Sequence, residues 1–201
     1  MKRFAFIASA ILLIAGCANP QEIRPHHYGS IESMQFGHFT PGPNWRPIET
    51  LEDLEEMSAN IVRGRMGDDA RILFQTVVGH NFVSLEILEI IKGELNIGDI
   101  ITIVEPYQID DGVFFTSSNY MPSFPHQEYF FFLSDQIDYE NIPKQYYGAF
   151  WVLHGEKGRF PVPSNIADTQ SLNAVEFGLS YLVDNELYMR LWQKVINAYI
   201  N

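Results

Sequence analysis

Short runs of apolar and β-branched residues, separated by Gly, Asn and Asp, recur along the middle of this 201-residue chain. This pattern predicts β-strands with turns between them. The expected strands are residues 60–66, 71–78, 82–91, 100–104, 112–116, 128–134, 149–153 and 158–162. Gly79-His80-Asn81 is the expected hairpin connection between the second and third of these. Repeated short strands without intervening helices predict an antiparallel sandwich or barrel.

Within the sixth expected strand, Tyr129-Phe130-Phe131-Phe132-Leu133 is apolar at consecutive positions, which is typical of a strand buried on both faces. A helix is predicted over residues 51–59, because Thr50 can cap it and acidic residues follow in the first turn. A second helix is predicted over residues 185–199, with Asp184 as its cap. Its apolar stripe consists of Leu187, Leu191, Val195 and Tyr199. We expect this helix to pack across the barrel or to plug one of its ends.

The beginning of the chain has the parts of a secretory signal peptide. Two basic residues, Lys2 and Arg3, precede an apolar or small stretch over residues 4–14, and the chain then reads Ile14-Ala15-Gly16-Cys17. These four residues resemble the lipobox of bacterial lipoproteins. The resemblance implies that residues 1–16 are removed and that diacylglycerol is attached to the thiol of Cys17. An ordinary secretory signal with an incidental cysteine, or a short membrane anchor, remains the alternative.

Lipidation would place the protein in the bacterial cell envelope, anchored to a membrane by acyl chains such as palmitate and facing away from the cytoplasm. Ala18 follows the cysteine, whereas Asp at that position is associated with retention in the inner membrane, so we expect the outer membrane if the host has two. Cys17 is the only cysteine, so no intramolecular disulfide can form.

The following segment, residues 17–49, is rich in Pro and Gly, and we interpret it as a tether from the lipidated cysteine to a single domain over residues 50–201. His26, His27 and His38 lie in the tether, and we expect no metal site there.

The formal net charge is −12, and it would be −14 without Lys2 and Arg3. This acidic balance argues against nucleic acid as a partner and against a polybasic attachment to anionic lipid. The simplest consequence of the charge is solubility.

The order of elements between residues 51 and 162 resembles that of uncharacterised secreted and lipoprotein domains. A helix leads into a strand, a later strand ends at Lys92-Gly93, and an aromatic strand follows. The layout is remotely similar to the OB-type barrels of netrin-like modules and tissue inhibitors of metalloproteinases. The resemblance implies a mainly β (α+β) fold: a small antiparallel OB-like β-barrel with a short N-terminal helix and a C-terminal α-helix. It does not imply inhibition, because those inhibitors use a disulfide-held N-terminal cysteine and Cys17 has no partner.

No sequence motif identifies catalytic residues or a cofactor. His154-Gly155-Glu156 has the spacing of zinc deaminases but lacks their cysteines, and the pairs Asp68-Asp69 and Asp110-Asp111 fall in expected turns. We therefore expect a non-catalytic binding or adaptor module that contacts an envelope protein, a peptide or a glycan, or a purely structural lipoprotein. The alternative is an envelope hydrolase whose site combines His80, His126 and His154 with the acidic pairs.

Overall fold

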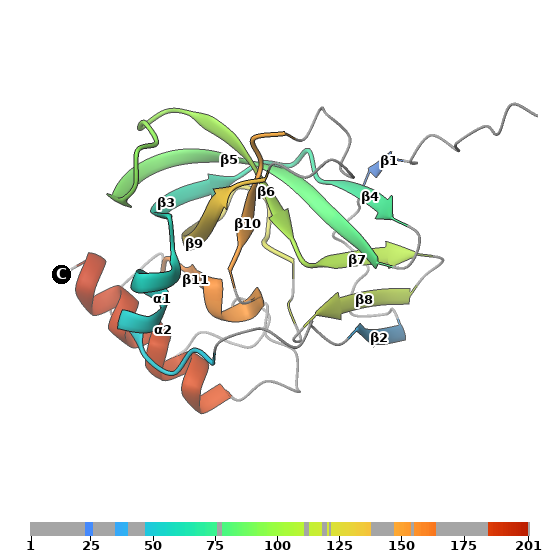
Figure 1. Cartoon of the computed structure of the whole chain (residues 1–201). Helices are drawn as coiled ribbons and strands as arrows, with labels where there is room; N and C mark the ends of the chain where they lie inside the picture. Colours follow the sequence, from blue (N-terminus) through green and yellow to red (C-terminus); the bar gives the residue numbers. More distant parts are fainter. Residues whose placement is uncertain are drawn as a thin grey trace, which may run out of the picture.

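The computed structural model describes residues 23–25, 35–39, 47–75, 78–110, 113–117, 120, 122–137, 147–153, 155–163 and 185–200. Its centre is a closed five-stranded barrel of the OB-like type (Figure 1). The strands follow one another around the barrel as β5, β3, β9, β10 and β6, and β6 pairs again with β5. Their bounds are β3 Asn60–Met66, β5 Val78–Lys92, β6 Ile100–Glu105, β9 Glu128–Gln136 and β10 Phe150–Val152. The OB-like barrel predicted from the sequence is confirmed.

One pair of strands differs from the antiparallel arrangement that we predicted. β10 runs parallel to β6, with Phe150 opposite Ile103 and Trp151 opposite Val104. A parallel pair needs a long crossover connection, and the chain between these strands includes β7 (Tyr107–Asp110), β8 (Val113–Ser117) and β9. The four other pairings of the barrel are antiparallel.

The predicted hairpin connection at Gly79-His80-Asn81 is wrong. These residues belong to β5, where they pair with β4 (Arg71–Gln75); His80 lies opposite Leu73, and Asn81 opposite Ile72. The connection itself falls at residues 76–77, outside the described residues. The Gly-His-Asn sequence suits a turn locally, but the ladder between β4 and β5 determines its conformation.

Two short strands come from the segment that we interpreted as a tether. β1 (Ile23–Pro25) pairs antiparallel with β4, and β2 (Gln35–Phe39) pairs parallel with β8, which itself forms a hairpin with β7. His38 lies in β2, whereas His26 and His27 fall outside the described residues. The domain boundaries drawn from the sequence stay a prediction.

Both faces of β9 are buried, as predicted. Phe131, like Tyr129 and Leu133, packs in the interior of the barrel. Phe130 and Phe132 point outward into a second core, which is formed with α1 (Leu51–Met57), α2 (Asn185–Tyr199) and β11 (Arg159–Pro161). Successive side chains of β9 point to opposite faces, so this one strand contributes to both hydrophobic cores.

Both predicted helices are present. Thr50 and Asp53 form a capping box at the start of α1, which ends at Met57, two residues earlier than expected. α2 has the bounds expected from its stripe and packs across the outside of the barrel through β9 and β11. Trp192 donates its indole N–H to the carbonyl of Pro161 at 2.9 Å. Among the described residues, neither helix has the length and apolar character required to cross a bilayer.

Candidate functional site

A carboxylate and a guanidinium are buried together at one end of the barrel interior. Glu105 is the last residue of β6 and Arg159 is the first of β11. Their side chains are 0% and 2% exposed, and Nη1 of Arg159 lies 3.7 Å from Oε1 of Glu105. Removing two charges from water is costly, and their attraction offsets that cost only when further hydrogen bonds satisfy them. The hydrogen-bond partners around the pair therefore determine whether its burial is offset.

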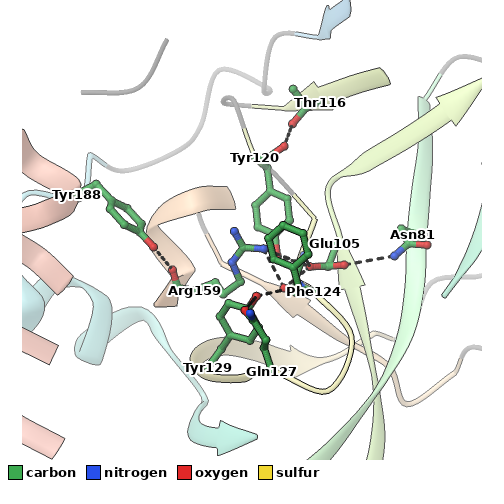
Figure 2. Close-up of polar contacts among 10 residues, drawn as sticks. Asn81, Glu105, Thr116, Tyr120, Phe124, Gln127, Tyr129, Arg159 and Tyr188 are labelled. Carbon is green, nitrogen blue, oxygen red and sulfur yellow. Dashed lines mark hydrogen bonds and ion pairs between the residues drawn. The ribbon is translucent and has the colours of Figure 1, made fainter. Parts of the chain in front are cut away.

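Glu105 receives hydrogen bonds from three neighbouring residues (Figure 2). Oε1 accepts from the hydroxyl of Tyr120 at 2.7 Å, and from Ser123 through its backbone N–H at 2.9 Å and its hydroxyl at 2.6 Å. Oε2 accepts from Nδ2 of Asn81 at 3.3 Å. Protein donors thus replace the water that the carboxylate loses on burial.

Arg159 is surrounded by aromatic rings. Its guanidinium carbon lies 4.6 Å from the ring centre of Tyr120 and 5.2 Å from that of Tyr129 (Figure 2), within the range of cation–π attraction. Nη1 also donates to the hydroxyl oxygen of Ser123 at 2.9 Å. Burial raises the pKa of Tyr120 well above its usual value, although the positive charge of Arg159 acts to lower that pKa. The Tyr120 hydroxyl therefore stays protonated and donates to Glu105.

The same cluster holds the chain segment that leads into β9. The hydroxyl of Tyr129 accepts from the backbone N–H of Phe124 and donates to Oε1 of Gln127, both at 2.9 Å. Thr116 of β8 donates its hydroxyl to the carbonyl of Tyr120. Glu105 and Arg159 thus connect β6, β8, β9 and β11 with the described residues 120 and 122–127. This arrangement is suited to holding elements together, since its charged groups are inaccessible to a substrate.

Our sequence reasoning did not identify Glu105 or Arg159 as a pair. A signal for Glu105 was present: it has the same parity as Ile101 and Ile103, which face the interior from the same strand. Arg159 lies beside buried Phe160 in a strand of only three residues, where alternation is hard to recognise.

Among the described residues of the hydrolase hypothesis, His80 lies apart from His126 and Asp68. His80 is partly buried on β5, and its ring meets Trp151 edge-on at 4.5 Å between centres. Burial lowers the pKa of His80 to about 4, so its imidazole is neutral at pH 7. His126 is exposed, and its Nε2 lies 3.8 Å from the carboxylate of Asp68, which is also exposed. His154 lies outside the described residues.

The acidic pairs show local roles where they are described. Asp69 accepts the backbone N–H of Ser84 at 2.9 Å, and this contact ties the turn after β3 to β5. Asp110 ends β7, and Asp111 lies outside the described residues. Within the described ranges, no three His, Cys, Asp or Glu residues are grouped so that they could hold a metal ion. Cys17, the predicted lipidation site, also lies outside these ranges.

The described surface carries three exposed large apolar side chains. Ile97 is 69% exposed and lies in the connection from β5 to β6, and Ile100, the first residue of β6, is 74% exposed. Tyr147, which is 42% exposed, lies in the turn before β10. Exposed apolar side chains that lie close together in the chain can mark a contact surface.

Comparison with known proteins found no protein-family model that matches this chain and no significant match among curated proteins.

Proposed function

We propose that this chain is a lipid-anchored domain of the bacterial cell envelope and that its OB-like barrel is a non-catalytic binding or adaptor module. The observation that carries the proposal is the sequence Ile14-Ala15-Gly16-Cys17 behind a basic and apolar leader. Two acyl chains at one cysteine form a stable anchor, whereas one chain binds a membrane only marginally.

The chemistry of the buried pair supports a structural role for the most prominent charged cluster of the barrel. A general acid or base must reach the proton that it transfers, directly or through one water. Glu105 and Arg159 are instead enclosed, and their hydrogen bonds go to the domain's own side chains and backbone. This arrangement supports the proposal that the barrel acts through its surface and not through the buried pair.

Ile97 and Ile100 supply the candidate contact surface of the module. Apolar side chains gain free energy when a partner removes them from water. Such a surface fits an envelope protein or peptide better than a glycan, which offers mainly hydroxyl groups. The acidic net charge supports neither nucleic acid nor a polybasic contact with lipid.

The anchor is tested by acyl labelling in cells. We expect the natural chain to incorporate a palmitate analogue and to fractionate with membranes. Cys17→Ala should lose the label and either accumulate as a precursor or be released. Ala18→Ser keeps the cysteine and is the matched control, which should still be labelled. Membrane-bound Cys17→Ala chains that carry label would refute the proposal.

The contact surface is tested by site-specific photo-cross-linking in intact cells. A photoreactive residue replaces Ile100 in one variant and Gln193, exposed on α2, in the other. We expect a discrete cross-linked product from position 100 and a weaker or absent one from position 193. No product above background at position 100 would contradict the assignment of this surface.

A further inference from the structure

β1 joins the sheet very soon after the predicted lipidation site. It pairs antiparallel with β4, so that Ile23 lies opposite Leu73 and Pro25 opposite Arg71. Because the strands are antiparallel, Ile23 at the start of β1 lies nearer than Pro25 to the end of β4 at Gln75. Cys17 is therefore connected to the domain through Ile23, which lies beside β4.

The reach of this connection is short. Only residues 18–22 separate Cys17 from Ile23. An extended chain spans at most about 3.3–3.6 Å per residue, which limits the distance from Cys17 to Ile23 to about 20 Å. Once β1 is paired, the chain between β1 and α1 adds nothing to this reach. The working tether is thus far shorter than residues 17–49.

The helices lie at the opposite end of the molecule from β1. Val78 at the start of β5 pairs with Gln75 of β4, whereas Lys92 at its end donates to the carbonyl of Glu55 in α1 at 2.6 Å. The fifteen residues of β5 cover about 50 Å along the strand's path, at about 3.3 Å each. Figure 1 shows β1 and β4 at one side of the domain, and α1 and α2 at the other.

The acidity of α1 agrees with this polarity. α1 has the sequence Leu-Glu-Asp-Leu-Glu-Glu-Met, and Glu52 and Glu56 are exposed on it. Arg71, about half exposed, lies beside β1 at the other end and forms an ion pair with Asp69 at 3.5 Å. An anionic lipid surface attracts nearby cations and repels carboxylates over roughly a Debye length, which is about 8 Å at physiological salt.

We propose that the pairing of β1 with β4 orients the domain on the membrane. The side of the domain formed by β1, β4 and the start of β5 faces the lipid surface, and α1 and α2 face away from it. Ile100 pairs with Glu86, well along β5 from β1, so the candidate contact surface is also held away from the lipid. The inference rests on the proposed lipidation of Cys17 and deepens it, because it assigns the membrane-facing surface.

The test uses two placements of one insertion. A ten-residue Gly/Ser spacer is inserted either between Glu22 and Ile23, before β1, or between Gly29 and Ser30, after it. A flexible spacer of this length has a root-mean-square span of about 17 Å. If β1 is paired, the first insertion lengthens the connection between lipid and barrel, and the second does not.

The readout is energy transfer from a dye on the lipidated protein to acceptor-labelled lipid headgroups in vesicles. Because lipidation consumes the only native thiol, one introduced cysteine carries the dye, in Arg71→Cys near β1 or in Gln193→Cys on α2. We expect stronger transfer from position 71 than from position 193. The insertion before β1 should increase the apparent distance from dye to surface by up to about 17 Å at both positions. The insertion after β1 should leave transfer unchanged.

The outcomes separate the two proposals. Chains that carry no acyl label refute the lipidation itself. Labelled chains in which both insertions reduce transfer equally, or in which the two dye positions give equal transfer, refute the orientation by β1 alone.

Discussion

Tyr188 of α2 donates its hydroxyl to the backbone carbonyl of Arg159 at 3.0 Å. The residue that supplies the buried cation of the barrel therefore also binds the C-terminal helix. The side chain of Arg159 points toward Glu105 in the barrel interior. Its backbone carbonyl accepts the hydrogen bond from Tyr188, which belongs to the outer core. A substitution that disturbs the contacts on one side of β11 should consequently weaken the contacts on the other side.

The first prediction concerns the buried pair. Glu105→Leu and Arg159→Met should each reduce the free energy of unfolding by about 3–5 kcal/mol, because each leaves the other charge buried without its opposite charge. The double variant should lose much less than the sum of the two. Denaturant unfolding of the purified protein measures both effects, and additive losses would contradict the pairing.

An exposed ion pair in the same barrel provides the control for that prediction. Arg65 contacts Glu128 at 3.0 Å and Glu86 at 3.2 Å, and all three side chains are accessible to water. Arg65→Ala should cost no more than about 1 kcal/mol, and the loss should shrink at high salt.

The second prediction concerns the attachment of α2. Tyr188→Phe keeps the ring, which stacks on Phe160 at 5.2 Å between centres, but removes the hydrogen bond to Arg159. The buried carbonyl then loses a donor, so we expect a loss of about 1 kcal/mol in unfolding free energy. In the Tyr188→Phe variant, backbone amide hydrogen exchange should become faster in α2 than in β3. Equal stability of Tyr188→Phe and the natural protein would show that the contact contributes nothing.

The third prediction is a pH dependence that arises from His80. Burial lowers its pKa in the folded protein to about 4, against 6.5 for an ordinary histidine. The folded protein thus binds fewer protons than the unfolded chain between these values. The stability associated with neutral His80 is complete above pH 6.5 and is lost as the pH falls toward 4, by about 3 kcal/mol.

His80→Phe keeps an aromatic ring against Trp151 and should flatten this part of the pH profile. His126→Gln, at an exposed position, is the matched control and should leave the profile unchanged. Unfolding free energies between pH 4 and 7 give the comparison. A profile of His80→Phe that matches the natural one would remove His80 as the cause.

The fourth prediction concerns Gly93, which follows β5 and has a φ of 107°. An added Cβ would also collide with the side-chain amide oxygen of Asn60. Gly98 has a φ of 89°, but the space around it is open. Gly98→Ala should cost about 1–3 kcal/mol from backbone strain alone, and Gly93→Ala should cost more. Thermal unfolding of the two variants tests the order, and a smaller loss in Gly93→Ala would contradict it.

Local patterns were enough to predict several elements. Apolar residues at every fourth position predicted α2, and the cap at Thr50 predicted the start of α1. The consecutive apolar residues of β9 predicted its burial on both faces. In each case the signal and the structure that it produces lie within one segment, so the nearest neighbours in the chain carry the information.

The sequence by itself determined the strand-rich fold class and the two helices, and it supplied the prediction of a lipid at Cys17. Only the tertiary structure decided that Glu105 meets Arg159, that β10 runs parallel to β6, and that β1 joins β4. These contacts join segments that are far apart in the chain, and the local preferences of each segment allow many partners. The choice among partners depends on closing the barrel around one core, where a buried charge must meet its opposite and each inner strand must find two neighbours.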